Sequence, residues 1–151
     1  MRTEYKSILI LVALVLSPSP AKAREDPAGT RIDYNGFAAL TAEVGGYREG
    51  RLLDPEQFFE EAARQGALLL DTRSADAFAR GHIEGAVNLP FSDFTEASLA
   101  RVIGEDRDRP IFIYCNNNFT DDTEPVATKK APLALNIPTF INLYGYGYTD
   151  V

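Results

Sequence analysis

Short apolar blocks separated by polar segments occupy the second half of the chain and predict strands that alternate with helices. The clearest block is residues 111–114, Ile-Phe-Ile-Tyr, which follows Pro110 and is β-branched or aromatic throughout. A strand covered on both faces lacks polar alternation, so this block predicts a fully buried strand of a parallel sheet. Residues 67–70 predict another buried strand, which ends in Asp71.

The clearest helix start is the Asp-Pro-Glu-Gln segment at residues 54–57. Asp54 is placed as the N-cap, Pro55 as the first helical residue, and Gln57 at the spacing of a capping box. The apolar face that follows consists of Phe58, Phe59, Ala62 and Ala63, and the helix is expected to end at Gly66. A second helix is predicted at residues 92–104. Thr95 is its N-cap candidate, and its apolar stripe consists of Leu99, Val102 and Ile103.

Residues 32–50 give a mixed signal. Residues 37–40, Phe-Ala-Ala-Leu, favour a turn of helix, whereas Gly45-Gly46 and Gly50 are expected to break any longer element. We therefore assign residues 24–50 to a leader and N-terminal segment that precedes one folded domain at residues 51–151.

The first residues have the three-part pattern of a secretory signal peptide. Arg2 and Lys6 give a basic start, residues 7–17 form an apolar run of about eleven residues, and residues 21–23 read Ala-Lys-Ala. A membrane-spanning helix needs about twenty apolar residues, so this run is too short to remain as an anchor. We expect removal of residues 1–23 and an exported product, periplasmic or secreted, with no membrane contact afterwards.

Composition and charge narrow the range of partners. The chain has 151 residues, of which 45% are hydrophobic and 25% charged, as in one ordinary globular domain. Its formal net charge is −7, and loss of the signal peptide would make it more acidic. An acidic chain is a poor partner for nucleic acid, so we expect none. The single cysteine cannot form an internal disulfide.

One stretch, residues 68–90, carries a specific pattern. A strand-like Leu-Leu-Leu leads into Asp71-Thr-Arg73, and a short helix with a serine cap follows. The Gly-His-Ile-Glu-Gly-Ala segment at residues 81–86 then precedes a strand-like Val-Asn-Leu-Pro. This pattern resembles the rhodanese-like domain family, and the resemblance covers about residues 53–151. It implies an α/β fold in which a central, mostly parallel sheet has helices on both faces.

Most residues of this pattern are expected to be structural. Asp71 and Arg73, at the end of a strand, are expected to hold the loop together through a charge-assisted pair. His82 is the only histidine, and we interpret it as a packed, hydrogen-bonded residue rather than a general base. Gly81 and Gly85 are expected to permit close packing or positive φ angles.

The only cysteine, Cys115, directly follows the strand predicted at residues 111–114. Ligands of open α/β sheets bind beyond the carboxyl ends of the strands, so Cys115 is the first candidate for chemistry. The resemblance to rhodaneses implies that this thiol attacks the outer sulfur of a donor and carries it as a persulfide. It also implies that the following loop surrounds the sulfur, and this loop consists of Asn116, Asn117, Asn118 and Phe119.

The chain departs from the family pattern after Cys115. The usual loop is short and carries an arginine near its end, whereas no arginine follows Cys115 here. Lys129 and Lys130 are the only basic residues beyond it and are candidates for binding the donor. The carboxylates of Asp121, Asp122 and Glu124 lie close in sequence and disfavour a second negative charge on the Cys115 sulfur. Without the loop arginine, thiosulfate is expected to be a less suitable donor.

The last residues indicate how long this loop is. Residues 143–151 fit the family pattern Leu-x-x-x-Gly-aromatic-x-x-Val, which marks the end of a helix and the start of the last strand. On this alignment the helix opens at Pro138, although local propensity at residues 139–144 favours a strand. Residues 116–137 then form an enlarged loop. A helix of its own is expected at residues 124–135, which would make the insertion a lid or a partner surface.

Two functions remain open. The first is a sulfurtransferase or persulfide carrier that moves sulfane sulfur through a Cys115 persulfide, from a small donor to a thiol or protein acceptor. The second is a non-catalytic rhodanese-like module whose acidic loop binds a protein partner. A phosphatase would need an arginine to grip phosphate, and we expect no cofactor and no metal site. The family continues beyond Val151 with a strand and a helix, so we expect a trimmed fold or an incomplete sequence.

Overall fold

The computed structural model describes residues 31–119 and 128–151. The predicted signal peptide and the first residues of the leader lie outside this part of the chain. So do three acidic residues of the enlarged loop, Asp121, Asp122 and Glu124. Predictions that concern these segments alone therefore stay predictions.

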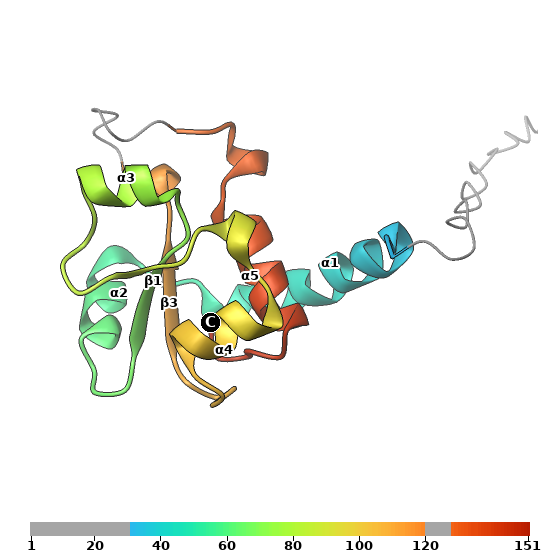
Figure 1. Cartoon of the computed structure of the whole chain (residues 1–151), viewed down its shortest axis with the longest axis horizontal. Helices are drawn as coiled ribbons and strands as arrows, with labels where there is room; N and C mark the ends of the chain where they lie inside the picture. Colours follow the sequence, from blue (N-terminus) through green and yellow to red (C-terminus); the bar gives the residue numbers. More distant parts are fainter. Residues whose placement is uncertain (1–30, 120–127) are drawn as a thin grey trace, which may run out of the picture. The chain divides into compact units, whose positions relative to one another are not determined.

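Three short strands form a parallel sheet in the order β2-β1-β3 (Figure 1). The strands are β1 (Leu68–Asp71), β2 (Val87–Asn88) and β3 (Ile111–Tyr114). Central strand β1 pairs with β2 on one side and β3 on the other, so that Asp71 lies opposite both Asn88 and Tyr114. The two strands predicted from apolar blocks are thus confirmed, as is their parallel arrangement. The carboxyl ends of β1 and β3 lie side by side.

Helices cover both faces of this sheet (Figure 1). On one face α2 (Pro55–Ala62) packs its Phe58 ring edge-on against Phe112 of β3, with ring centroids 5.7 Å apart. On the other face lie α4 (Glu96–Ile103) and α5 (Asn136–Gly145). The main core is on this second face, and it contains Leu68, Leu70, Leu89, Leu99, Ile103, Ile111, Leu143 and Tyr148. The α/β architecture implied by the resemblance is therefore present.

Strand β3 is less buried than its apolar sequence predicted. Its end residues Ile111 and Tyr114 are buried, whereas Phe112 and Ile113 are only half-buried. The reason is a groove of about 520 Å³ that runs along this strand and is lined by both residues. The prediction of a fully buried strand is therefore wrong for its two middle residues.

Local capping signals place the starts of three helices. Asp54 caps α2 by accepting a hydrogen bond from the Gln57 N–H at 2.9 Å, and Gln57 accepts one in return. Thr95 caps α4, which begins at Glu96 rather than at residue 92 because a 3-10 turn (Phe91–Asp93) precedes it. Ser74 caps α3 (Ala75–Arg80), the short helix of the signature segment. In α2 the apolar face is narrower than predicted, since Phe59 is 53% exposed.

Helix α1 (Tyr34–Arg48) runs straight through Gly45 and Gly46, so the predicted break there is wrong. Each glycine costs a helix interior about 1 kcal/mol relative to alanine. Tertiary packing offsets this cost, because Val44 is buried against Phe140 and Ile141 of α5. The Tyr47 hydroxyl also donates to the Thr149 carbonyl at 2.7 Å.

Residues 139–144 are helical, as the family pattern predicted and local strand propensity did not. They belong to α5, which begins two residues before Pro138, and its apolar side chains pack into both core clusters. The helix predicted at residues 124–135 is wrong in its described part, where a 3-10 turn (Ala131–Leu133) carries the proline. After α5 the chain returns to β3, where the Ile111 N–H donates to the Asp150 carbonyl at 2.7 Å.

No helix within residues 31–119 and 128–151 is long and apolar enough to cross a membrane.

Candidate active site

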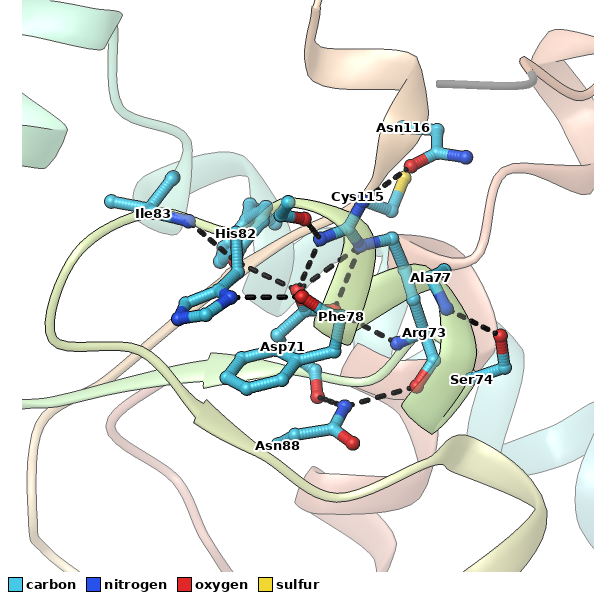
Figure 2. Close-up of polar contacts among 12 residues, drawn as sticks. Asp71, Arg73, Ser74, Ala77, Phe78, His82, Ile83, Asn88, Cys115 and Asn116 are labelled. Atoms are coloured by element: carbon cyan, nitrogen blue, oxygen red, sulfur yellow. Dashed lines mark hydrogen bonds and ion pairs between the residues drawn. The ribbon is translucent and has the colours of Figure 1, made fainter. Parts of the chain in front are cut away.

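Cys115 lies directly after β3, at the edge of the sheet where β1 also ends. The register places Asp71 opposite Tyr114, so the residues that follow both strands meet here (Figure 2). The Cys115 side chain is buried, with 2% of the residue exposed. The structure therefore places the thiol directly after the carboxyl end of β3, as the sequence predicted. The side chains around the thiol determine what chemistry it can support.

Asp71 and Arg73 form the charge-assisted pair expected from the sequence. The Arg73 Nε lies 3.0 Å from both carboxylate oxygens, and its Nη2 lies 2.6 Å from Oδ2. The Arg73 backbone N–H also donates to Oδ1 at 2.9 Å. Asp71 is fully buried and Arg73 is 6% exposed, so this is an ion pair shielded from water.

The Tyr114 hydroxyl completes a buried network with this pair. It donates to Asp71 Oδ2 at 2.7 Å and accepts from the Ile83 N–H at 3.1 Å. Burial alone would raise the pKa of Asp71, but hydrogen bonds from Arg73 and Tyr114 outweigh it and hold that pKa below its ordinary value. Burial, followed by the hydrogen bond to Asp71, raises the pKa of Tyr114 to about 12. At neutral pH the network therefore holds a carboxylate, a guanidinium and a neutral phenol.

Arg73 connects this network to the residue that follows the cysteine. Its Nη1 donates to Asn116 Oδ1 at 3.0 Å, and its Nη2 also donates to the Gly81 carbonyl at 2.7 Å (Figure 2). Sequence reasoning gave Arg73 only a structural role and sought an arginine after Cys115. In the structure, the arginine at the site is instead Arg73, from the loop that follows β1. The available signal was its place two residues beyond the end of the central strand.

Asparagines of the cysteine loop hold its backbone in shape. Residues 116–118 form a 3-10 turn (Asn116–Asn118), in which the Cys115 N–H donates to Asn118 Oδ1 at 2.9 Å. Asn118 Oδ1 also accepts from Asn136 Nδ2 at 2.8 Å, at the start of α5. Phe119 packs edge-on against Tyr114, with ring centroids 6.0 Å apart. Asn118 and Phe119 thus shape the loop without lining the space beside the thiol.

A small pocket of about 160 Å³ lies beside Cys115. Three of the predicted loop residues line it together with the cysteine. Among the described residues, the lining consists of Arg73, Ser74, Ala77, Cys115, Asn116, Asn117, Lys129 and Leu135. Lys130 does not line it. The larger groove along β3 does not include Cys115. The pocket is where a ligand can meet the thiol, and its lining includes one nucleophile and two basic residues, Arg73 and Lys129.

Comparison with protein families matches residues 54–150 to the Rhodanese-like domain. The chain belongs to the rhodanese-like domain family. Among curated proteins, it is similar to the thiosulfate sulfurtransferase GlpE of Pseudomonas putida, with 37% identity over 67 residues. These residues are 44% of this chain and 57% of that protein, so the match spans little more than half of the relative. No solved structure matches the chain.

The remaining family signature residues lie outside the pocket lining of this rhodanese-like domain. His82 is exposed, its ring stacks on Phe78 with centroids 3.8 Å apart, and its Nδ1 lies 2.8 Å from the Phe78 carbonyl oxygen. Gly85 has a φ of 83°, which favours glycine, whereas Gly81 has an extended φ of 172° that any residue adopts. The expectation of a positive φ is therefore met by Gly85 and not by Gly81.

Tyr114→Phe is expected to remove a tyrosine whose pKa lies well above the ordinary value. An ordinary tyrosine has a pKa of about 10, whereas that of Tyr114 is about 12. In an absorbance titration of phenolate, the difference between wild type and variant should therefore develop near pH 12. Because the folded pKa is the higher one, the stabilisation is present below about pH 10 and is lost as the pH rises further. A difference centred near pH 10 would contradict the buried network.

Proposed function

We propose that this rhodanese-like domain is a sulfurtransferase or persulfide carrier whose nucleophile is Cys115. The observation that carries the proposal is the pocket in which a buried thiol meets Arg73 and Lys129. The similarity to a thiosulfate sulfurtransferase supports the same chemistry. A small anionic donor such as thiosulfate fits a pocket of about 160 Å³ that has cationic lining.

The reaction has two balanced steps. The Cys115 thiolate attacks the outer sulfur of thiosulfate, so that a bond forms between Sγ and that sulfur. The bond between the two thiosulfate sulfurs breaks, and sulfite leaves with the electron pair. A thiolate acceptor then attacks the terminal sulfur of the resulting persulfide, which regenerates the Cys115 thiolate and releases the acceptor persulfide. No redox cofactor is required, since the transferred sulfane sulfur keeps its oxidation state in both steps.

The pocket residues have distinct roles in this proposal. Arg73 is a positioning residue, because it acts on the loop through Asn116 and its charge is compensated by Asp71. Lys129 supplies a cation for the donor anion, and it replaces the arginine that the usual loop carries. Asp71 and Tyr114 hold Arg73 in place. The acidic residues of the loop lie outside the described part of the chain, and no role is assigned to them.

Sulfite release tests the proposal. The purified chain is incubated with thiosulfate and a small thiol acceptor, and sulfite is measured over time against a blank without protein. Catalytic release that is proportional to protein concentration is the expected result. Release no faster than in the blank would contradict the enzyme.

Two observations favour a second candidate function. Cys115 is only 2% exposed and no arginine follows it in the sequence, which also suits a non-catalytic rhodanese-like module that binds a protein partner. A thiol that resists alkylation in the folded chain, together with no sulfite release, would support this second function.

Export of the product remains part of the proposal and rests on residues 1–23 alone.

A further inference from the structure

The side chain of Asn117, which lines the pocket, binds the backbone of a residue twelve positions further along the chain. Its Nδ2 donates to the Lys129 carbonyl at 2.7 Å, and its Oδ1 accepts from the Lys129 N–H at 3.1 Å. These two reciprocal bonds, here called the Asn117 clamp, join positions that are twelve residues apart. Both residues line the pocket, so the clamp joins two parts of its lining.

The clamp leaves room for only a few atoms beside the thiol. Pockets that hold drug-sized ligands measure about 300–1,000 Å³, whereas this one measures about 160 Å³. Cys115, at 2% exposure, presents almost none of its surface to a large reagent or to a protein. Access to the sulfur is therefore limited by size.

The charge of the pocket depends mainly on Lys129. Arg73 is paired with the fully buried Asp71, so its charge is largely compensated. Among residues 31–119 and 128–151, no acidic residue lines the pocket and no carboxylate forms an ion pair with Lys129. The chain as a whole has a net charge of −7 and repels anions, so a local cation is needed to attract one.

We propose that the Asn117 clamp sets the size limit of the ligand and that Lys129 sets its charge, so that Cys115 selects small anionic sulfur compounds. This inference rests on the proposed function, which it deepens by assigning two residues that determine specificity. The two effects can be separated, because Asn117 binds only backbone atoms of Lys129. Lys129→Gln removes the charge and keeps the clamp, whereas Asn117→Ala opens the clamp and keeps the charge.

The charge effect is tested with two alkylating reagents of nearly equal size, anionic iodoacetate and neutral iodoacetamide. Both react with the same thiolate, so the ratio of their rates at Cys115 reports the local field and cancels changes in the thiolate fraction. Lys129→Gln should lower the iodoacetate to iodoacetamide ratio by about three- to tenfold. Lys130→Gln removes an equal charge one residue away, outside the pocket lining, and should leave the ratio unchanged. Equal ratios in both variants would overturn the role of Lys129.

The size effect is tested with iodoacetamide and a bulky fluorescein iodoacetamide. Asn117→Ala should raise the bulky to small rate ratio about tenfold, because the wall at Lys129 is released. Asn142→Ala is the control, since its amide binds the Pro138 carbonyl on α5 and does not line the pocket. An unchanged ratio in Asn117→Ala, or no reaction of Cys115 with either small reagent, would overturn the inference.

Sulfite release by the same proteins distinguishes this inference from the proposed function. If wild type releases sulfite but both variants keep the wild-type rate ratios, only the assignment of Asn117 and Lys129 is overturned. Changed ratios in a chain that releases no sulfite would support the size and charge selection while contradicting the sulfurtransferase.

Discussion

Cys115→Ser is expected to abolish sulfite release from thiosulfate, with a loss on the order of 10³-fold or more. The reason is that the proposed persulfide needs a thiolate, and a serine hydroxyl at neutral pH is neither ionised nor able to carry a terminal sulfur in this way. The measurement is the rate of sulfite release with a small thiol acceptor, compared at equal protein concentration. Residual release above one-tenth of the wild-type rate would show that sulfur leaves thiosulfate by another route.

The control for this variant is its folded state. Cys115 is buried, so the replacement by serine must leave the urea midpoint close to that of wild type before its activity is interpreted. Lys130→Gln provides a second reference, because Lys130 lies outside the pocket lining and should retain full activity. A Lys130 variant as inactive as Cys115→Ser would place the reaction elsewhere than in this pocket.

Arg73→Met is expected to lower the free energy of unfolding by about 3–5 kcal/mol, since it leaves a buried carboxylate without its cation. Asp71 is fully buried and receives three side-chain hydrogen bonds from Arg73. The folded-state pKa of Asp71 lies below its ordinary value, so the stabilisation is present above about pH 4 and is lost as the pH falls through the folded pKa. The difference between wild type and variant in urea unfolding should therefore be large at pH 7 and shrink in acid.

A surface pair provides the matched control for Arg73. Arg64 Nη1 lies 2.6 Å from Glu61 Oε2, but the Arg64 side chain is 61% exposed. Arg64→Met should therefore lower the free energy of unfolding by less than about 1 kcal/mol. Adding Asp71→Asn to Arg73→Met should recover part of the lost stability, because no uncompensated charge then remains buried. Similar small losses for Arg64→Met and Arg73→Met would show that the Asp71 pair contributes little to folding.

Elements with strong local signals were predictable from the sequence. The short apolar blocks of β1 and β3 predicted strands, and the Asp54 cap located the start of α2. The position of Cys115 followed from the strand before it. In each case the information lies in a few consecutive residues, and tertiary contacts agree with it.

Several features that the sequence did not predict depend on contacts between distant residues. Helix α1 crosses Gly45-Gly46 because α5, nearly a hundred residues away, covers Val44, and no local pattern reports that packing. Arg73 reaches the pocket because β1 and β3 pair in register. The Asn117 clamp and the choice of Lys129 over Lys130 depend on how the chain returns to the loop. Sequence alone identified these side chains and could not place them.

Whether Cys115 carries sulfane sulfur is tested by the intact mass of the chain, purified without reductant, after incubation with thiosulfate. We expect a gain of one sulfur atom that is removed by a thiol reductant and is absent from Cys115→Ser. No gain in mass while Cys115 remains an unmodified thiol would contradict the assignment of this pocket to sulfur transfer.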